Sequence, residues 1–161
     1  MAGVDVPFEP KSNAHLEPGQ FWAIPLSNGT FACGRVLAVP HTPDPSIPVN
    51  SRAFLAGLLG WVGDEPPTSD AIAGAPLIAQ GFAHVLTIRR SGGLILGRRP
   101  LEVDGMAPRL WLARPFTDDA WVYRGAERLR AAEPSDASLP VIAGWGVRYI
   151  AELAERTFVA R

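Results

Sequence analysis

Three residues of this chain have side chains that could together perform hydrolysis: His84, Asp64 and Glu65. An imidazole and two carboxylates around one pocket can hold a metal ion that activates a water molecule. The carboxylates also lie close to Trp61, a large aromatic residue that can line a cleft, and directly before Pro66-Pro67, where carboxylates commonly cap a turn. Paired carboxylates indicate catalysis only when they share a pocket and have perturbed pKa values. We therefore assign no catalytic residue and retain Trp61, Asp64, Glu65 and His84 as candidate binding residues.

The remaining metal-binding and nucleophilic residue types have no spacing that is typical of a catalytic or metal site. His15, His41 and His84 are far apart, and the sequence has no His-x-His, His-Glu-x-x-His or Cys-x-x-Cys pattern. No Gly-x-Ser-x-Gly motif occurs. Cys33 falls within an expected strand, where a free cysteine packs as a small hydrophobic residue. We predict neither a bound metal nor a cofactor.

Arginines flank a predicted hairpin and indicate an interaction surface. The hairpin has strands at 84–90 and 94–98, joined by a turn at Ser91-Gly92-Gly93. Its arginines are Arg89, Arg90, Arg98 and Arg99. Arginine and tryptophan are enriched in protein interfaces, so Arg98, Arg99 and Trp111 are further candidate binding residues. The alternative is a solvated strand face that Glu102 and Asp104 partly neutralise.

An earlier hairpin is predicted over residues 18–39. Asn28-Gly29 separates two apolar runs, and this dipeptide adopts the positive φ angles of a tight turn at low cost. We expect Trp22, Ile24 and Leu26 to share a face with Phe31, Cys33 and Leu37. Both a two-residue loop and a four-residue loop at Ser27–Thr30 keep these partners. We prefer the longer loop because it moves Pro25 to a non-bonded pair, and Pro25 indicates an edge strand.

The remaining elements follow from shorter patterns. Residues 41–49 are proline-rich and predict a loop, whereas residues 52–62 fit a short helix or a buried strand. We also expect a short helix from about Asp70 to Gly74, strands at 110–113 and 121–124, a polar break at 133–140 and a terminal helix that begins close to Trp145.

Many short strands followed by one amphipathic helix predict an α+β fold dominated by an antiparallel sheet. Our specific expectation is an SH3-like bent sheet or partial barrel with a C-terminal helix. We expect residues 1–17 to form an N-terminal arm and residues 18–161 to form one domain. The sequence predicts no oligomeric state.

Composition argues against several classes of function. A net charge of −1 over 161 residues does not fit a general nucleic-acid binder, which would be strongly basic. No apolar run reaches the ~18 residues of a membrane span, and the first residues lack the features of a secretory signal. The single cysteine suits a reducing cytoplasm, where we expect the protein to act.

Four segments of the sequence stand out: PGQFWAIPLSNGTFACGRVL, GLLGWVGDEPPT, GGLILGRRPL and WGVRYIAELAE. Together they resemble immunity protein family 26 of bacterial polymorphic toxin systems, with a similarity that extends from Pro18 to Phe158. The resemblance implies a protein that binds and neutralises a cognate toxin through its contact surface. The family label is shared with a small phosphotriesterase, so a hydrolase is an alternative, although the sequence lacks the clustered histidines of known binuclear phosphotriesterases. A peptide- or nucleic-acid-binding barrel, with Trp22, Trp61 or Trp111 as a stacking platform, is a third hypothesis.

Overall fold

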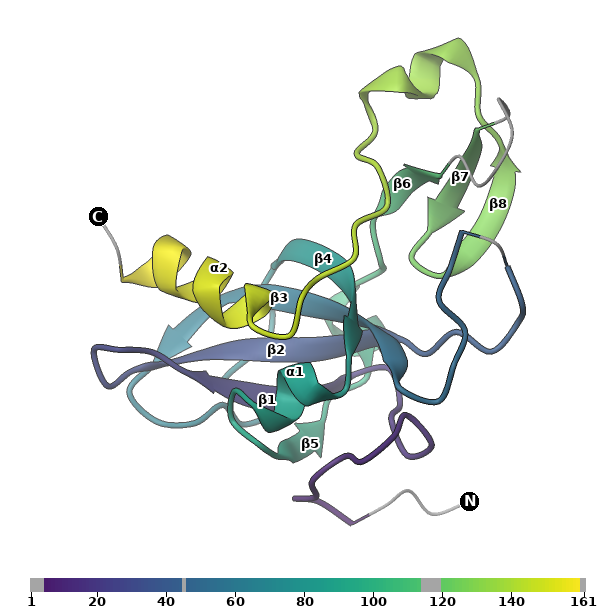
Figure 1. Ribbon diagram of the computed structural model, residues 1–161. Helices are drawn as coiled ribbons and strands as arrows, with labels where there is room; N and C mark the ends of the chain where they lie inside the picture. Colours follow the sequence, from purple (N-terminus) through teal and green to yellow (C-terminus); the bar gives the residue numbers. More distant parts are fainter. Residues whose placement is uncertain (1–4, 45, 114–119, 160–161) are drawn as a thin grey trace.

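The structure is a computed structural model that describes residues 5–44, 46–113 and 120–159. Its strands are β1 (Gln20–Pro25), β2 (Phe31–Ala38), β3 (Ala53–Gly63), β4 (Leu77–His84), β5 (Ile95–Arg98), β6 (Leu110–Ala113), β7 (Trp121–Arg124) and β8 (Glu127–Ala131). The helical elements are α1 (Leu86–Arg89), the 3-10 turns η1 (Leu101–Asp104) and η2 (Pro134–Ser138), and the terminal helix α2 (Tyr149–Phe158). The predicted α+β class, mainly antiparallel with a C-terminal helix, is confirmed (Figure 1).

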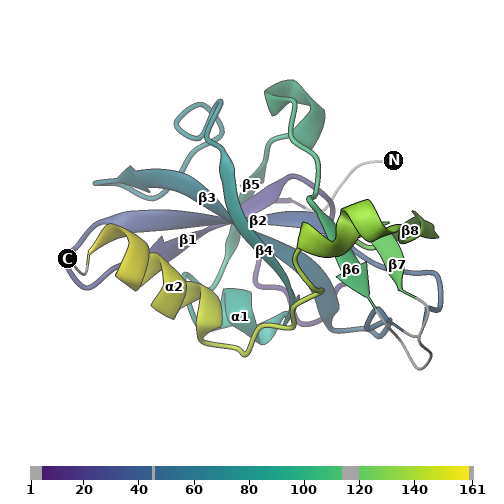
Figure 2. The same ribbon diagram turned by 90° about the horizontal axis from the view of Figure 1, so that it is seen from above.

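The strands form two antiparallel sheets. The larger has the order β4-β3-β2-β1-β5 and the smaller has the order β6-β7-β8. Helix α2 packs against β1, β2 and β3, and Figure 2 shows α1 and α2 beside one another on the same side of the large sheet. The small sheet projects from one end of the molecule, and an extended segment leads from it back to α2 (Figure 1). Within the described residues neither sheet closes on itself, and the SH3-like arrangement stays a prediction.

Both faces of the large sheet bury apolar side chains, and other parts of the chain cover each face. On the helix-covered face, Trp22 is fully buried and packs edge-on against Phe54 at 5.9 Å between ring centroids. The opposite face buries Phe21, Cys33 and Leu59. Strand β2 therefore contributes side chains to three apolar clusters and shows an almost continuous run of buried residues.

The first hairpin forms where it was predicted, but its register differs from the expected one. Leu26 N–H donates to the carbonyl of Thr30 over 2.9 Å, and Gly29 has a φ of +86°, so the loop contains three residues. Trp22 consequently pairs with Gly34. An odd loop length shifts the register by one residue and moves Cys33 to the face opposite Trp22. Pro25 still falls in a non-bonded pair, at the end of β1 that lies beyond its pairing with β5.

The predicted second hairpin is wrong. Residues 77–84 form β4, residues 86–89 turn into α1, and β5 pairs with β1 instead of with the preceding segment. The Ser91 hydroxyl explains part of this path, because it accepts a hydrogen bond from the Trp22 indole over 3.0 Å. Gly92 lies so close to the carbonyl of Ala23 that a Cβ atom there would clash. Tertiary contacts with β1 therefore direct this segment away from β4.

The other expectations have mixed outcomes. Residues 53–63 form a strand, and β6 and β7 have the predicted bounds. The segment near Asp70 forms turns instead of a helix. Helix α2 begins at Tyr149 and not near Trp145, because the Trp145 N–H donates to the carbonyl of Phe82 over 2.7 Å and holds the chain extended against β4.

Candidate binding site

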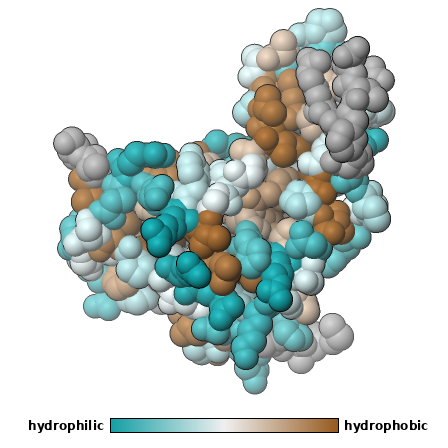
Figure 3. All heavy atoms as spheres, in the orientation of Figure 1, coloured by the Kyte–Doolittle hydropathy of each residue, from teal (hydrophilic) through white to brown (hydrophobic). Residues whose placement is uncertain are grey.

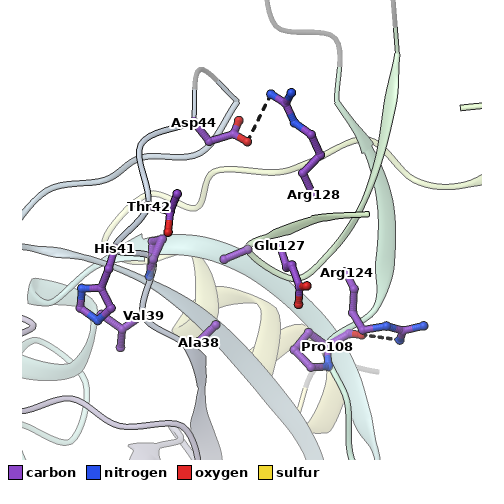
Figure 4. Close-up of a pocket in the computed structure, with 11 residues that line it drawn as sticks. Ala38, Val39, His41, Thr42, Asp44, Pro108, Arg124, Glu127 and Arg128 are labelled. Carbon is purple, nitrogen blue, oxygen red and sulfur yellow. Dashed lines mark hydrogen bonds and ion pairs between the residues drawn. The ribbon is translucent and has the colours of Figure 1, made fainter. Parts of the chain in front are cut away.

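A groove of about 550 Å³ lies between the segment that follows β2 and the β7–β8 hairpin (Figure 4). Residues 38–44 form one wall, and Pro108 with the start of β8 forms the other. The charged or titratable residues that line it are His41, Asp44, Arg124, Glu127 and Arg128. The groove therefore lies between the loop that follows β2 of the large sheet and the β7–β8 turn of the small sheet.

Asp44 and Arg128 form an ion pair across this groove (Figure 4). The Nη2 atom of Arg128 lies 3.3 Å from Oδ2 of Asp44. The hydroxyl of Tyr123 links them a second time, because it donates to Oδ1 of Asp44 over 2.8 Å and accepts from Nε of Arg128 over 3.2 Å. The loop and the small sheet are thus connected by a closed network of three side chains.

The sequence of β7 explains why Arg128 is held in this place. Trp121 and Tyr123 are two residues apart on a strand, so their rings lie on the same face. The guanidinium of Arg128 lies 4.8 Å from the Trp121 ring centroid and 5.9 Å from that of Tyr123, within the range of a cation–π interaction. The hydrogen bond with Tyr123, with Asp44 contributing, raises the pKa of Arg128 above its ordinary value. Arg128 is a fixed cation.

This arrangement suits recognition of an anionic or carbonyl-bearing partner. An arginine stays protonated at all physiological pH values, so it binds by charge-assisted hydrogen bonds and does not exchange protons. The side chain of Arg128 remains 36% exposed despite its ion pair. Arg124, which donates from Nη1 to the carbonyl of Pro108 over 3.1 Å, adds a second exposed guanidinium at the same turn.

A buried ionic network holds strand β2, whose end leads into the loop that lines the groove. Arg35 of β2 is fully buried and donates from Nη1 to Oδ2 of Asp104 over 2.9 Å. Asp104 also accepts from Nε of Arg99 and from the N–H of Gly74. The hydrogen bond from Arg99 is the main cause that holds the pKa of Asp104 well below its usual range. The network ties β2, η1 and the turn at Gly74 together.

The three residues considered for hydrolysis do not converge. His84 pairs with Ala53 at the first residue of β3, whereas Asp64 and Glu65 follow Gly63 at the last. Ten residues along a strand span about 33 Å. His84 accepts a hydrogen bond at Nδ1 from the N–H of Leu86 over 3.0 Å, and burial together with the nearby Arg52 and Arg89 lowers its pKa. In residues 5–44, 46–113 and 120–159, no three His, Cys, Asp or Glu side chains are grouped in a way that could hold a metal ion.

The other predicted binding residues lie in separate places. Trp111 is buried, stacks on Phe82 at 5.4 Å and donates to the carbonyl of Gly125. Trp61 packs beside the cluster formed by Phe21, Cys33, Leu59 and Ile72. Arg98 is exposed at the end of β5, and Arg99 belongs to the buried network. The predicted binding residues therefore fall into local groups that are already neighbours in the sequence, with Trp61, Asp64 and Glu65 around Gly63 and with Arg98 beside Arg99.

The sequence analysis did not identify the groove residues. Asp44 belongs to the segment predicted as a proline-rich loop, and Arg128 lies beyond the last predicted strand. A usable signal was present, since two aromatic residues, Trp121 and Tyr123, precede the tight turn at Gly125 and Arg128 follows it. Gly125 has a φ of +57°. Recognition of β8 as a strand would have placed Arg128 beside the two rings.

The fold and the groove define a small antiparallel α+β protein with a charged groove between its two sheets. The family model described as Immunity protein 26 matches residues 17–109, which is more than half of the chain. This chain belongs to that family. Neither the curated proteins nor the solved structures contain a significant match. The matched segment ends at Arg109, before β6, and includes the loop of Asp44 but not Arg128. In the described part of the chain, no helix has the length and apolar character needed to cross a membrane.

Proposed function

We propose that this chain is an immunity protein that binds a cognate toxin of a bacterial polymorphic toxin system in the cytoplasm and neutralises it. Membership of the Immunity protein 26 family is the observation that carries the proposal. An immunity protein needs a complementary contact surface and no reaction of its own. The contact surface that we propose is the groove of Asp44 and Arg128 together with the adjoining small sheet.

The charge and position of this surface support the proposal. Arg128 is held by Asp44, Tyr123 and the ring of Trp121, so little side-chain entropy is lost when a partner contacts it. Arginines of this kind are typical of binding hot spots. Apolar surface lies close by, since Leu129 is 44% and Val141 is 70% exposed. Figure 3 shows apolar surface over the small sheet and the adjoining segment.

The extent of the family match also fits this location. The small sheet lies outside the matched segment, and immunity proteins that meet different toxins must differ where they make specific contacts. In such a surface, the loop of Asp44 lies within the segment that the family model matches and belongs to a scaffold that the family shares. The hairpin of Arg128 lies outside that segment and can vary between proteins that bind different toxins.

The test is co-expression of this chain with the toxin that is encoded beside its gene. We expect the wild-type chain to restore growth and to co-purify with the toxin. Arg128→Ala should weaken the complex by about tenfold or more. Arg90→Ala is the matched control because Arg90 is an exposed arginine next to α1, remote in sequence from the groove. Failure of the wild-type chain to bind and to protect would overturn the proposal.

A further inference from the structure

The four edge strands of the two sheets are β4, β5, β6 and β8, and they differ in how their outer sides are covered. The outer side of β4 bonds to the segment that leads to α2. Phe82 N–H donates to the carbonyl of Ala143 over 2.9 Å, and its own carbonyl accepts from Trp145 over 2.7 Å. Arg109 donates to the carbonyls of Ile78 and Leu77 on the same strand. An additional strand cannot pair with β4 without displacing these groups.

The outer sides of β6 and β5 are covered in the same way. Leu112 of β6 donates to the carbonyl of Pro140 and accepts from Ile142, both over 2.8 Å. Ile95 of β5 exchanges two hydrogen bonds with Phe8, at 2.8 and 3.1 Å. Backbone from this chain therefore occupies the outward groups of Leu112 in β6 and of Ile95 in β5.

The outer side of β8 is different. Among the described residues, no backbone hydrogen bond beyond its pairing with β7 involves Glu127–Ala131, and all five residues are exposed. Unpaired backbone groups on an edge strand form a template for another strand. In the described part of the molecule, β8 is thus the open edge.

The register shows which groups of β8 point away from β7. Ala132 N–H donates to the carbonyl of Ala120 over 2.9 Å, and Trp121 pairs with Ala131. Bonded and non-bonded pairs alternate along antiparallel strands. Ala131 is therefore in a non-bonded pair, with its N–H and carbonyl directed outward. The guanidinium of Arg130 lies 3.3 Å from that carbonyl.

We propose that the toxin binds by adding an extended, acidic segment to β8 as a fourth strand of the small sheet. Strand addition supplies affinity through backbone hydrogen bonds and specificity through side chains. Strand addition at β8 rests on the proposed immunity function. It adds to that function a binding edge, β8, and an acidic, extended toxin segment as its occupant.

The charge of β8 determines the kind of segment that fits. Arg128 and Arg130 remain 36% and 48% exposed although they pair with Asp44 and Asp136, and Glu127 is the only acidic residue of the strand. A basic strand is repelled by the exposed parts of these guanidiniums, whereas an acidic strand can form further ion pairs with them beside Asp44 and Asp136. Pairing with a second copy over all five residues, centred on Leu129, would set Arg128 against the other copy's Arg130. Such like-charge pairs are destabilising, so the occupant is a different, acidic strand.

Two substitutions at Ala131 test the backbone pairing directly. Ala131→Pro removes an outward N–H that forms no bond within the sheet, and Ala131→Val retains this N–H with a side chain of similar bulk. We expect Ala131→Pro to weaken toxin binding by about tenfold or more and Ala131→Val to change it by less than about threefold. Thermal unfolding of both variants shows whether they fold equally well.

Hydrogen exchange on the wild-type chain gives an independent result if the proline variant folds poorly. The Ala131 amide should exchange slowly in the toxin complex and rapidly in the free protein, and added salt should weaken the complex. Equal binding by both variants, or an Ala131 amide that stays unprotected in a complex that forms, overturns strand addition and leaves the immunity function intact. A free chain that is a dimer through β8 also overturns it. Failure of the wild-type chain to bind the toxin removes both proposals.

Discussion

Arg35 of β2 and Asp104 of η1 form a buried ion pair, with Nη1 and Oδ2 separated by 2.9 Å and side chains that are 0% and 2% exposed. The two residues are far apart in the sequence, and their contact joins the centre of the large sheet to the connection between β5 and β6. Arg35 also donates to the carbonyls of Arg99 and Pro100. The pair therefore holds one side of the sheet against its covering loops.

Asp104→Asn should destabilise the protein strongly. Removal of one partner from a buried ion pair leaves the other charge uncompensated and costs about 3–5 kcal/mol. Urea unfolding of the variant and of the wild type would measure this difference. Glu102→Gln, an exposed position on the same 3-10 turn, is the control and should change the free energy of unfolding by less than about 0.5 kcal/mol. Equal effects of the two substitutions would contradict the proposed role of the pair.

Acid should destabilise the protein through Asp136. Arg130 donates to both carboxylate oxygens, at 2.7 and 2.9 Å, and the Glu133 N–H adds a third bond. These contacts lower the pKa of Asp136 to about 2. A folded-state pKa below the unfolded value of about 3.9 gives stability that is present above pH 4 and is lost as the pH falls through the folded-state pKa.

The measurement for Asp136 is the free energy of unfolding at several pH values between about 5 and 2. Asp136→Asn should lower stability at the upper end of this range and should flatten the decline. Asp64→Asn serves as the comparison because Asp64 is exposed beyond the end of β3. An unchanged pH profile in Asp136→Asn would show that this carboxylate does not contribute.

Tyr123→Phe should loosen the groove without removing a ring from the core. The Tyr123 hydroxyl bonds to both Asp44 and Arg128, and the residue is fully buried. Loss of this hydroxyl should cost about 1–3 kcal/mol. Thermal or urea unfolding measures the change. Tyr149→Phe is the control, because it removes a hydroxyl from a ring that packs against Trp145, away from Asp44 and Arg128. A larger effect at Tyr149 would argue against the network.

Gly34→Ala should destabilise the large sheet. Gly34 pairs with Trp22, and a Cβ atom at Gly34 would overlap the indole ring, which is fully buried and cannot move aside. Overpacking of this kind costs about 1–3 kcal/mol. Gly144→Ala is the matched control because no atom lies within 4 Å of its added Cβ. We expect a clearly lower melting temperature for Gly34→Ala alone, and equal melting temperatures would disprove the steric argument.

Local residue chemistry was sufficient to predict several elements. Asn28-Gly29 correctly indicated the first hairpin, and the short strands at 110–113 and 121–124 match β6 and β7. The apolar stripe near the C-terminus predicted a terminal helix, which begins at Tyr149 and not near Trp145. These features depend on backbone preferences and on the period of side chains along a strand or helix, and both are local properties.

The register, the path after β4 and the site were decided by tertiary structure. The sequence around Asn28-Gly29 fits a three-residue loop and a four-residue loop almost equally well. The two loops differ in which side chains of β2 lie on the same face of the sheet as Trp22. The segment around Ser91 follows β1 because Trp22 bonds to it, and Asp44 meets Arg128 only because the small sheet packs beside the loop after β2. The sequence by itself determined which local elements form. Contacts between distant residues determined how they pair and which charges meet, because the energy of such contacts depends on positions that no local pattern encodes.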